Sequence, residues 1–336
     1  MSSVTVVTHA NIALIKYWGK RDQLLHLPTK SSLSVGLDAL ATQTTIERTS
    51  LPTDQVFING APAAANAAQP IMTFLTLFKQ MYGITSTLSI SSINNFPTAA
   101  GLASSASGFS ALALGLDRLF NLGLTSAQLS ILARRGSGSA CRSCFGGFVI
   151  WHQGQAADGH DSVAEQLFPA EHWPELRIIV VLVSATPKAV SSRVAMQRSA
   201  TTSAHYAQWL EESRERLQHM HGALAAKDLA AIGCLAEADC LGMHKTMHTS
   251  QPPINFWSAT TAAVMQAIID LRTKDGVTCY FTIDAGPNVK ILCHAAAVAT
   301  ILTPLNTIPG VIRCITSAVA HEPTVTLKRN NRHANH

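Results

Sequence analysis

The chain has 336 residues, of which 47% are hydrophobic and 13% charged, with a formal net charge of +5. This composition excludes a disordered chain and a coiled coil, which both need far more charge, and no apolar run approaches the ~20 residues of a membrane span. The N-terminus also lacks the basic start and long apolar core of a signal peptide. We therefore expect a soluble, cytoplasmic protein that binds neither membrane nor nucleic acid.

The first half of the chain mixes expected strands with expected helices. Alternating or β-rich runs between turn residues predict strands at 4–8, 34–37, 43–47, 56–58, 87–93 and 147–151. Apolar residues with helical spacing predict helices at 68–82, 104–120 and 125–134.

The second half is mostly helical. A buried strand is expected at 176–184, followed by helices at 204–225, 229–247 and 256–272 and by strands at 279–283 and 289–293. This order indicates an α+β fold and not the regular alternation of a doubly wound parallel sheet. We expect the two halves to join at the strand 176–184. The basic residues near the end, Lys328, Arg329 and Arg332, are interpreted as a frayed, solvated tail.

Cysteines and histidines give weaker signals. The seven cysteines are odd in number and irregularly spaced, which favours free thiols in a reducing compartment. Cys141-x-x-Cys144 has no second pair to complete a zinc ribbon, so buried inert thiols are expected. His244 and His248 could share a helix face, but no glutamate follows the first histidine and no third ligand is evident.

The strongest chemical signal is the segment NFPTAAGLASSASG at 95–108, where an expected strand passes through small residues into a helix. Backbone N–H groups of such a loop, and the positive end of the helix, can hold an anion. Ser104, Ser105 and Ser107 add hydroxyls for phosphate oxygens or a metal ion. The segment matches neither the Walker A motif nor the dinucleotide fingerprint, and a tight turn with serine caps explains it equally well.

Three further segments carry polar residues in unusual places. Lys16 lies between an apolar run and two aromatics, which fits a lysine beside an anion or one that snorkels from an edge. RRGSGSACRS at 134–143 separates serines and arginines by glycines, as expected for a phosphate or carboxylate cradle or for a solvated loop. Asp284 ends an apolar strand before a Gly-Pro turn, as a functional carboxylate or an Asx-turn residue.

Together these segments resemble the mevalonate diphosphate decarboxylase family of the galactokinase–homoserine kinase–mevalonate kinase–phosphomevalonate kinase (GHMP) superfamily. The matching stretches, which follow the family's order, are NIALIKYWGKRD at 11–22, LPTKSSLSVGLD at 27–38, NNFPTAAGLASSASGF at 94–109, RRGSGSACRSCFGGF at 134–148 and FTIDAGPNVK at 281–290. One departure is that Thr8, His9 and Ala10 precede Asn11, without the proline often found there in the family.

The resemblance implies an enzyme, an ATP-dependent carboxy-lyase. Its expected reaction converts mevalonate 5-diphosphate to isopentenyl diphosphate and releases ADP, phosphate and CO2, with ATP and Mg²⁺ required. The expected fold has a ribosomal-S5-like, ATP-binding GHMP domain at 1–183, a ferredoxin-like domain at 184–320 and the basic tail at 321–336. A homodimer is expected.

The resemblance also assigns roles by position. It implies that Asp284 and Lys16 are catalytic. The implied contacts of the substrate diphosphate and carboxylate are Tyr17, Lys20, Ser137, Ser139, Arg142, Ser192 and Arg193. The implied ATP-binding residues are Gly101, Leu102, Ala103, Ser104, Ser105 and Ser107, with Ser105 also a candidate Mg²⁺ ligand.

Other functions remain open at this point. A phosphomevalonate decarboxylase or a mevalonate 3-kinase-like enzyme would share most of these motifs, although Lys16 and Asp284 together favour a full decarboxylase. A catalytically silent ligand sensor is expected to have lost the aspartate or the phosphate loop. Lys16 could steady developing negative charge or keep Asp284 ionised.

Overall fold

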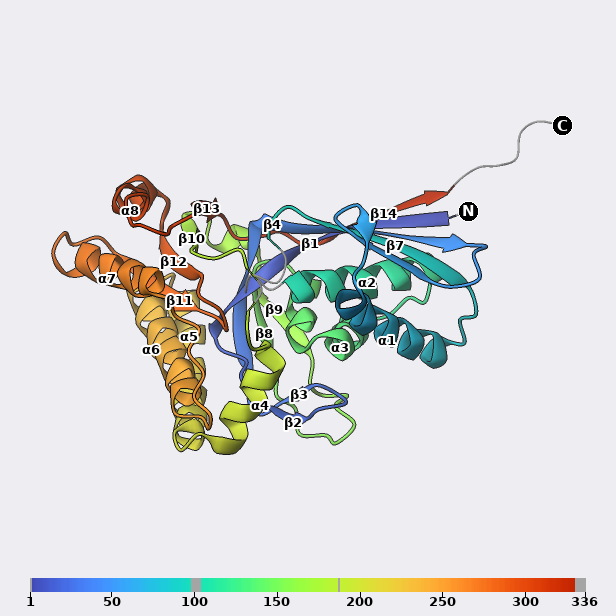
Figure 1. The fold of residues 1–336 in the computed structure, drawn as a ribbon, viewed down its shortest axis with the longest axis horizontal. Coiled ribbons are helices and arrows are strands. Elements are labelled where there is room, and N and C mark those ends of the chain that lie inside the picture. Colours follow the sequence, from blue (N-terminus) through green and yellow to red (C-terminus); the bar gives the residue numbers. More distant parts are fainter. Residues whose placement is uncertain (1, 98–103, 187, 330–336) are drawn as a thin grey trace.

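The computed structural model describes residues 2–97, 104–186 and 188–329. Its first sheet has eight strands, in the order β14-β1-β4-β7-β5-β6, with β8 paired to β4 and β9 paired to β8. Their bounds are β1 Ser2–Ile15, β4 Ser32–Thr49, β5 Gln55–Ile58, β6 Ala61–Pro62, β7 Thr87–Asn94, β8 Phe148–Trp151, β9 Ala164–Phe168 and β14 Thr324–Arg329. Figure 1 shows β1, β4 and β7 running side by side.

Two long strands form the frame of this sheet. The short strands expected at 34–37 and 43–47 are parts of the single strand β4, whose first half pairs with β8 and whose second half pairs with β7. The register of β1 against β4 shifts between His9 and Asn11, as in a β-bulge. The pairing ends at Ile15 opposite Leu33, so Lys16 is the first residue beyond the ladder.

Three helices cover one face of the first sheet (Figure 1). They are α1 Ala65–Tyr82, α2 Ser104–Phe120 and α3 Ser126–Gly136, and a 3-10 helix, η1 Gly138–Cys144, follows α3. Thr125 and Gln128 form a capping box at the start of α3. The helix α2 lies so close to the sheet that a Cβ at Gly115 would be 2.8 Å from Ile46 Cδ1.

The second sheet is antiparallel, in the order β11-β12-β10-β13. Its strands are β10 Leu176–Leu182, β11 Cys279–Ile283, β12 Val289–His294 and β13 Arg313–Ser317. Helices α4 Ser192–Thr202, α5 Tyr206–Ala225, α6 Leu229–His248 and α7 Ala259–Thr273 connect β10 to β11, and α8 Val298–Leu305 connects β12 to β13. This order of strands and helices is βαββαβ, which confirms a ferredoxin-like unit.

Short elements complete the described chain. A hairpin of β2 Lys20–Asp22 and β3 Leu27–Pro28 lies beside α4 in Figure 1. The remaining 3-10 turns are η2 Ala170–His172 and η3 Ala295–Ala297. Sequence periodicity missed β9, β13, α4 and α8.

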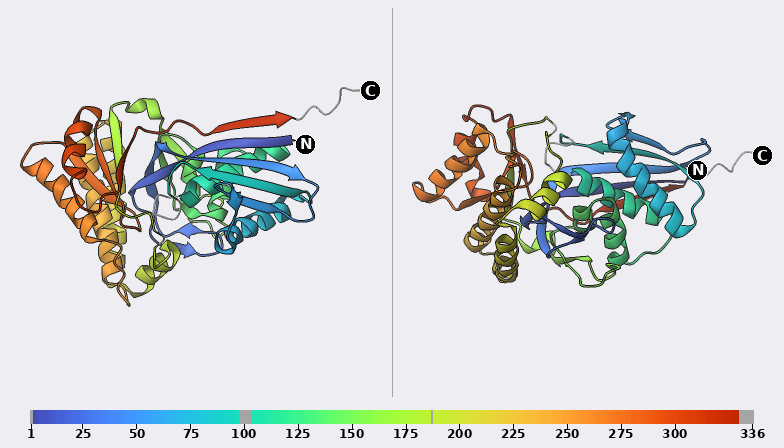
Figure 2. Two further views of the ribbon diagram at one scale, coloured as in Figure 1. Left: turned by 45° about the horizontal axis from the view of Figure 1, so that its top comes forward. Right: turned by 60° about the horizontal axis from the view of Figure 1, so that its bottom comes forward.

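Two expectations about organisation are wrong. The strand β10 pairs with β12 and β13 and so belongs to the second sheet, which puts the change between sheets before residue 176 and not after 183. Residues 324–329 are not a frayed tail: they form β14, which pairs with β1 from Ser2 opposite Arg329 to Val7 opposite Thr324. Figure 2 shows β14 along β1 in both views. Arg332 lies outside the described residues.

One hydrophobic cluster joins the two sheets. It combines Leu14 and Val35 of the first sheet with Ile178 and Leu292 of the second and Ile232 of α6. No helix within the described ranges is long and apolar enough to cross a membrane. All seven cysteines are free, and burial raises the pKa of the Cys144 thiol to about 12.

Candidate active site

Asp284 lies between two buried lysines. Lys16 Nζ donates to Asp284 Oδ1 at 2.8 Å, and Lys290 Nζ is 3.2 Å from Asp284 Oδ2. The two lysine side chains are 1% and 2% exposed, whereas the Asp284 side chain is 27% exposed. Two buried cations therefore contact the carboxylate, and part of the Asp284 side chain remains exposed.

The charge state of Asp284 follows from this contact. Burial raises the pKa of the carboxyl, but Lys16 and Lys290 outweigh burial and hold the pKa well below its usual range. Asp284 is therefore ionised throughout the physiological range. Of the two roles left open for Lys16, its position directly supports keeping Asp284 ionised.

Strand ends bring these three residues together. Lys16 follows the last paired residue of β1, and Asp284 follows the end of β11. Lys290 lies in β12, opposite Thr282 of β11. Sequence reasoning missed Lys290, although a lysine inside the apolar run VKILCH was a usable signal.

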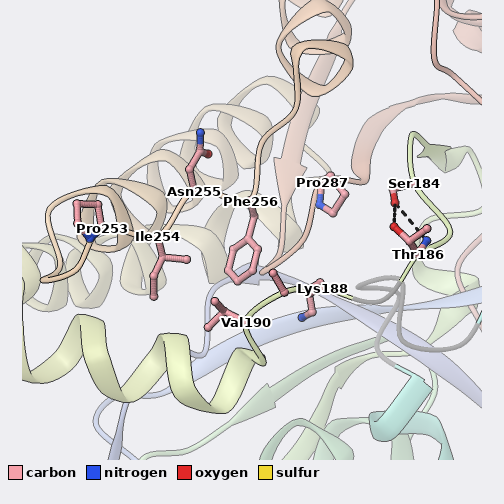
Figure 3. Close-up of a pocket in the computed structure, with 10 residues that line it drawn as sticks. Ser184, Thr186, Lys188, Val190, Pro253, Ile254, Asn255, Phe256 and Pro287 are labelled. Atoms are coloured by element: carbon pink, nitrogen blue, oxygen red, sulfur yellow. Dashed lines mark hydrogen bonds between the residues drawn. The ribbon is translucent and has the colours of Figure 1, made fainter.

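A further lysine near Asp284, Lys188, lies just before α4. Lys188 Nζ donates to Ser192 Oγ at 2.5 Å and to Ala285 O at 2.6 Å, next to Asp284. Burial, with Lys290 nearby, lowers the pKa of Lys188 to about 8. Lys188, Phe256 and Pro287 line a cavity of about 300 Å³ (Figure 3), and Lys188 Nζ lies 5.5 Å from the centroid of the Phe256 ring. Lys188 was not among the predicted site residues.

Cations without acidic partners gather at the β2–β3 hairpin. Lys20 and the exposed Arg193 are close enough that each affects ionisation there, and neither forms a salt bridge with a carboxylate of the described chain. Burial and Arg193 lower the pKa of Lys20 to about 8. Burial, Lys20 and other cations lower the pKa of His26 to about 4. An excess of positive charge this close together favours an anionic ligand.

Arg142 lies deeper, and within the described part of the chain its guanidinium donates hydrogen bonds to neutral groups. Its Nη1 donates to Ser32 Oγ at 2.6 Å, and its Nε donates to Ser34 Oγ at 3.0 Å and to Asn11 Oδ1 at 3.2 Å. These hydrogen bonds fix the position of the guanidinium against the first sheet, where its positive charge also acts on Asp284. Asn11, Ser32 and Ser34 were not predicted, although they lie within or beside the quoted motifs.

Tyr17 and the serine–glycine segment line the same region. The Tyr17 ring packs edge-on against Trp151 with centroids 4.6 Å apart, and its buried hydroxyl has no hydrogen-bond partner among the residues that the structure describes. A Cβ at Gly138 would lie 2.6 Å from that hydroxyl, which explains the glycine between Ser137 and Ser139. Burial raises the pKa of Tyr17, so the hydroxyl stays protonated and can donate.

The start of α2 meets this segment from the other side. Ser105 Oγ lies 3.3 Å from Ser137 Oγ, so the proposed phosphate loop and the serine–glycine segment are adjacent. Ser104 is the first residue of α2. Gly101, Leu102 and Ala103 lie outside the described residues.

Ser107 does not fit the predicted role. Its side chain is fully buried, its hydroxyl is 2.6 Å from Thr42 Oγ1, and it donates to Ser104 O at 3.3 Å. The hydroxyl therefore faces the sheet and joins α2 to β4. The prediction that it binds ATP phosphate is corrected on this point.

The histidine pair packs beneath the site. The rings of His244 and Trp257 are 4.7 Å apart, those of His248 and Trp257 are 5.1 Å apart, and His244 Nε2 is 3.4 Å from Ile283 O. Burial lowers the pKa of His244 to about 3, so it is neutral at physiological pH. Within the described ranges, no three His, Cys, Asp or Glu side chains are grouped to hold a metal.

Comparison with known proteins gives consistent matches over nearly the whole chain. Residues 8–164 match a family model described as diphosphomevalonate decarboxylase-like N-terminal domain, and residues 178–335 match the mevalonate 5-diphosphate decarboxylase C-terminal domain. The diphosphomevalonate decarboxylase of Aspergillus fumigatus is 40% identical over 305 residues, covering 85% of this chain and 76% of the relative.

Solved structures agree with the sequence matches. Mevalonate diphosphate decarboxylase from Staphylococcus aureus superposes with a TM-score of 0.91 at 36% identity, covering 98% of this chain and 99% of that one. A structure of MDDEF in complex with MVAPP, AMPPCP and magnesium has a TM-score of 0.90 at 38% identity, covering 97% and 99%. The predicted two-domain GHMP-type fold is thereby confirmed. The chain belongs to the diphosphomevalonate decarboxylase family.

Proposed function

We propose that this protein uses ATP to decarboxylate mevalonate 5-diphosphate, giving isopentenyl diphosphate, ADP, phosphate and CO2. The observation that carries the proposal is the ionised, partly open Asp284 between Lys16 and Lys290. The family matches and the structure of a relative with MVAPP, an ATP analogue and magnesium support the same reaction.

In the first step, the tertiary 3-hydroxyl oxygen of the substrate attacks the γ-phosphorus of ATP, and the bond to ADP breaks. Asp284 orients that hydroxyl by accepting its hydrogen bond. A carboxylate with so low a pKa is a weak base, but phosphoryl transfer depends mainly on positioning and on electrostatics. The proton moves late, to Asp284 and then to solvent, once the attacking oxygen has become acidic.

In the second step, the C3–O bond breaks and phosphate leaves with the bonding electrons. The C1–C2 bond then breaks, its electron pair forms the C2=C3 double bond, and CO2 departs. Lys16 and Lys290 stabilise Asp284 as an anion during both steps, and Arg142 adds positive charge near the substrate carboxylate.

The substrate diphosphate binds the unpaired cations of the hairpin and of α4. Lys20 and Arg193 supply charge, and Tyr17, Ser137, Ser139 and Ser192 supply hydroxyl donors. Arg193 lies close enough to Tyr17 and Lys20 to affect their ionisation, so an extended anionic group can contact several of these residues at once. A diphosphate gains more from this arrangement than a monophosphate, because it carries more charge and more acceptor oxygens.

Mg²⁺ and the nucleotide fit the remaining donors. Mg²⁺ prefers oxygen ligands and is often held by substrate phosphates with few protein groups, which suits a site where the Ser105 hydroxyl faces Ser137. Bound Mg²⁺ would neutralise phosphate charge. The start of α2 at Ser104 presents free backbone N–H groups to the same phosphates.

We also propose a homodimer in the cytoplasm. The support for localisation is the set of seven free cysteines, which suits a reducing compartment. The support for the dimer is family resemblance alone. Light scattering of the purified chain should give a mass of about twice 35.8 kDa, and a monomer at assay concentration would contradict this part.

The test of the function is a product assay on the purified full chain. ADP and CO2 are measured in parallel with mevalonate 5-diphosphate and with the 5-monophosphate. We expect equal amounts of ADP and CO2, and a much higher kcat/KM for the diphosphate. Equal kcat/KM for the two substrates would refute diphosphate specificity, and ADP without CO2 would indicate a 3-kinase.

A further inference from the structure

One turn of α6 contacts the backbone at both catalytic residues. Asp239 Oδ2 accepts a hydrogen bond from the Lys16 N–H at 2.6 Å. The next residue, Cys240, accepts through Sγ from the Ile283 N–H at 3.1 Å, immediately before Asp284. Adjacent residues of one helix thus fix the chain beside Lys16 and beside Asp284.

Lys30 completes the contact on the opposite side of Lys16. Lys30 Nζ donates to the Lys16 carbonyl oxygen at 2.6 Å and lies 5.0 Å from the centroid of the Trp209 ring. Trp209 Nε1 in turn donates to the Asp239 backbone oxygen at 3.1 Å. The N–H and the C=O of Lys16 are therefore both bonded to charged side chains.

These charges are costly to bury. Lys30 is 1% exposed and Asp239 is fully buried. Arg216 Nη1 lies 3.6 Å from Asp239 Oδ1 and forms a long ion pair with it. Burial of such groups is generally no more stabilising than a well-packed apolar cluster. The ladder of β1 ends at Ile15, so the Lys16 peptide has no strand partner of its own.

We propose that Asp239 and Lys30 are positioning residues, which fix the Lys16 peptide and thereby hold the Lys16 amine against Asp284. The proposal rests on the function proposed above. Lys16 Nζ donates both to Ala13 O at 2.9 Å and to Asp284 Oδ1 at 2.8 Å. The amine can make both bonds only if the Lys16 peptide keeps its position, so a small shift of the peptide moves the amine away from the carboxylate. Misplacement by about 1 Å can cost roughly 100-fold in rate.

The pKa of Asp284 is sensitive to the contact between Lys16 Nζ and the Asp284 carboxylate. The charged and titratable groups that face Asp284 come from the residue after β1, from β12, η1 and α6, and from the segment before α4. They are Lys16, Lys290, Arg142, Cys240, His244 and Lys188. His244 is neutral above a pKa of about 3, and burial raises the pKa of Cys240 to about 11. Between pH values of about 3 and about 11, Lys16 and Lys290 are therefore the groups that mainly determine the pKa of the Asp284 carboxyl.

The test compares four variants of the full chain. Asp239→Ala removes the acceptor for the Lys16 N–H, and Lys30→Met removes the donor to its carbonyl while keeping most of the unbranched side chain. Asp239→Asn retains an acceptor oxygen and is the conservative variant. Ile232→Ala, seven residues before Asp239 in the same helix and buried in the cluster that joins the two sheets, is the control for loss of stability.

We expect kcat to fall at least ~10-fold in Asp239→Ala and Lys30→Met, with the KM for each substrate changed less than about threefold. Asp239→Asn should restore most of kcat. As the pH falls from about 7 to about 5, Asp239→Ala should lose more activity than the wild type, because a displaced Lys16 lets the pKa of Asp284 rise.

Two results would overturn the proposal. One is near-normal kcat in folded Asp239→Ala and Lys30→Met. The other is an equal loss of kcat in Ile232→Ala, with the same pH profile in all variants. If Asp239→Ala does not fold, Lys30→Met decides by the same criteria. Failure of the proposed function is separate, because the wild type itself would then release no CO2.

Discussion

Lys20 is one of three lysines, with Lys30 and Lys188, whose pKa is lowered to about 8. Burial and Arg193 lower its pKa to about 8, so the amine is charged below this pH and neutral above it. Because kcat/KM reports the free enzyme, we expect kcat/KM for mevalonate 5-diphosphate to fall as the pH rises through about 8. Lys20→Arg should keep its charge and retain kcat/KM to higher pH.

The pH–rate profiles of the two proteins measure this directly. Lys188, whose pKa is also lowered to about 8, titrates in both proteins, so the difference between profiles isolates Lys20. Identical basic limbs in wild type and Lys20→Arg would show that Lys20 does not bind the substrate in its charged form.

Sequence motifs predicted some of the site residues, whereas others are recognised only from contacts between distant parts of the chain. Asp284 and Lys16 were predicted together, and the structure places them 2.8 Å apart. Asp239 was not predicted, because its partner, the Lys16 N–H, lies 223 positions away in the sequence. Ser107 was assigned wrongly, since the serine-rich run does not reveal which hydroxyl faces the sheet.

Two serines in the N-terminal turn of α2, Ser105 and Ser107, differ in function. Ser105 faces Ser137, whereas Ser107 bonds Thr42 in the core. We expect Ser105→Ala to lower kcat roughly 10-fold or more, by loss of a donor to the transferring phosphate, while the KM for mevalonate diphosphate changes little.

Ser107→Ala is the matched control for that helix. It should leave kcat and both KM values near those of the wild type and lower the free energy of unfolding by about 1 kcal/mol, through one lost buried hydrogen bond. Steady-state kinetics and urea unfolding check the pair. A change confined to substrate KM in Ser105→Ala would remove Ser105 from the phosphate site.

The strand β14 makes the C-terminal segment part of the first sheet. It pairs with β1 over six residues of each strand, and Leu327 packs on the core beneath α2. We expect truncation after Pro323 to lower the free energy of unfolding by on the order of 2–3 kcal/mol, from lost ladder bonds and apolar contacts. Truncation after Arg329 is the control, and an equal loss in both would contradict a stabilising role for β14.

Most helices were predicted within a few residues because their apolar spacing is regular. The strand β4 was divided into two because its burial pattern changes where it leaves β8 and joins β7. β14 was missed although Val325 and Leu327 alternate with polar residues, because its basic ending suggested a solvated tail. In both strands, the structure depends on pairing with segments distant in the sequence, which a local pattern does not reveal.

At the scale of the whole molecule, the two sheets share one core. Leu14 and Val35 pack in the same cluster as Ile178 and Leu292, with Ile232 of α6 among them. We therefore expect the protein to unfold in one cooperative transition, with equal calorimetric and van't Hoff enthalpies. Ile178→Ala should move that whole transition to lower temperature. Two separated transitions in differential scanning calorimetry would show that the sheets unfold independently.

The shared core also explains why the site lies where it does. Lys16 extends from the end of β1, Asp284 follows β11, and α6 packs against both strands. A rigid junction between two units can hold a lysine and an aspartate in fixed contact while leaving one face of the carboxylate open.

In the proposed reaction, Asp284 acts on the attacking hydroxyl. The most direct measurement is the parallel release of ADP and CO2 by wild type and Asp284→Asn with mevalonate 5-diphosphate. We expect both products to fall ~10²–10⁴-fold in kcat and in kcat/KM, because asparagine carries no charge and accepts no proton. Substrate affinity should be unchanged or higher, since an anion is removed from an anion-binding site. Near-normal release of both products by folded Asp284→Asn would contradict the account, and ADP release without CO2 would place Asp284 in the later step.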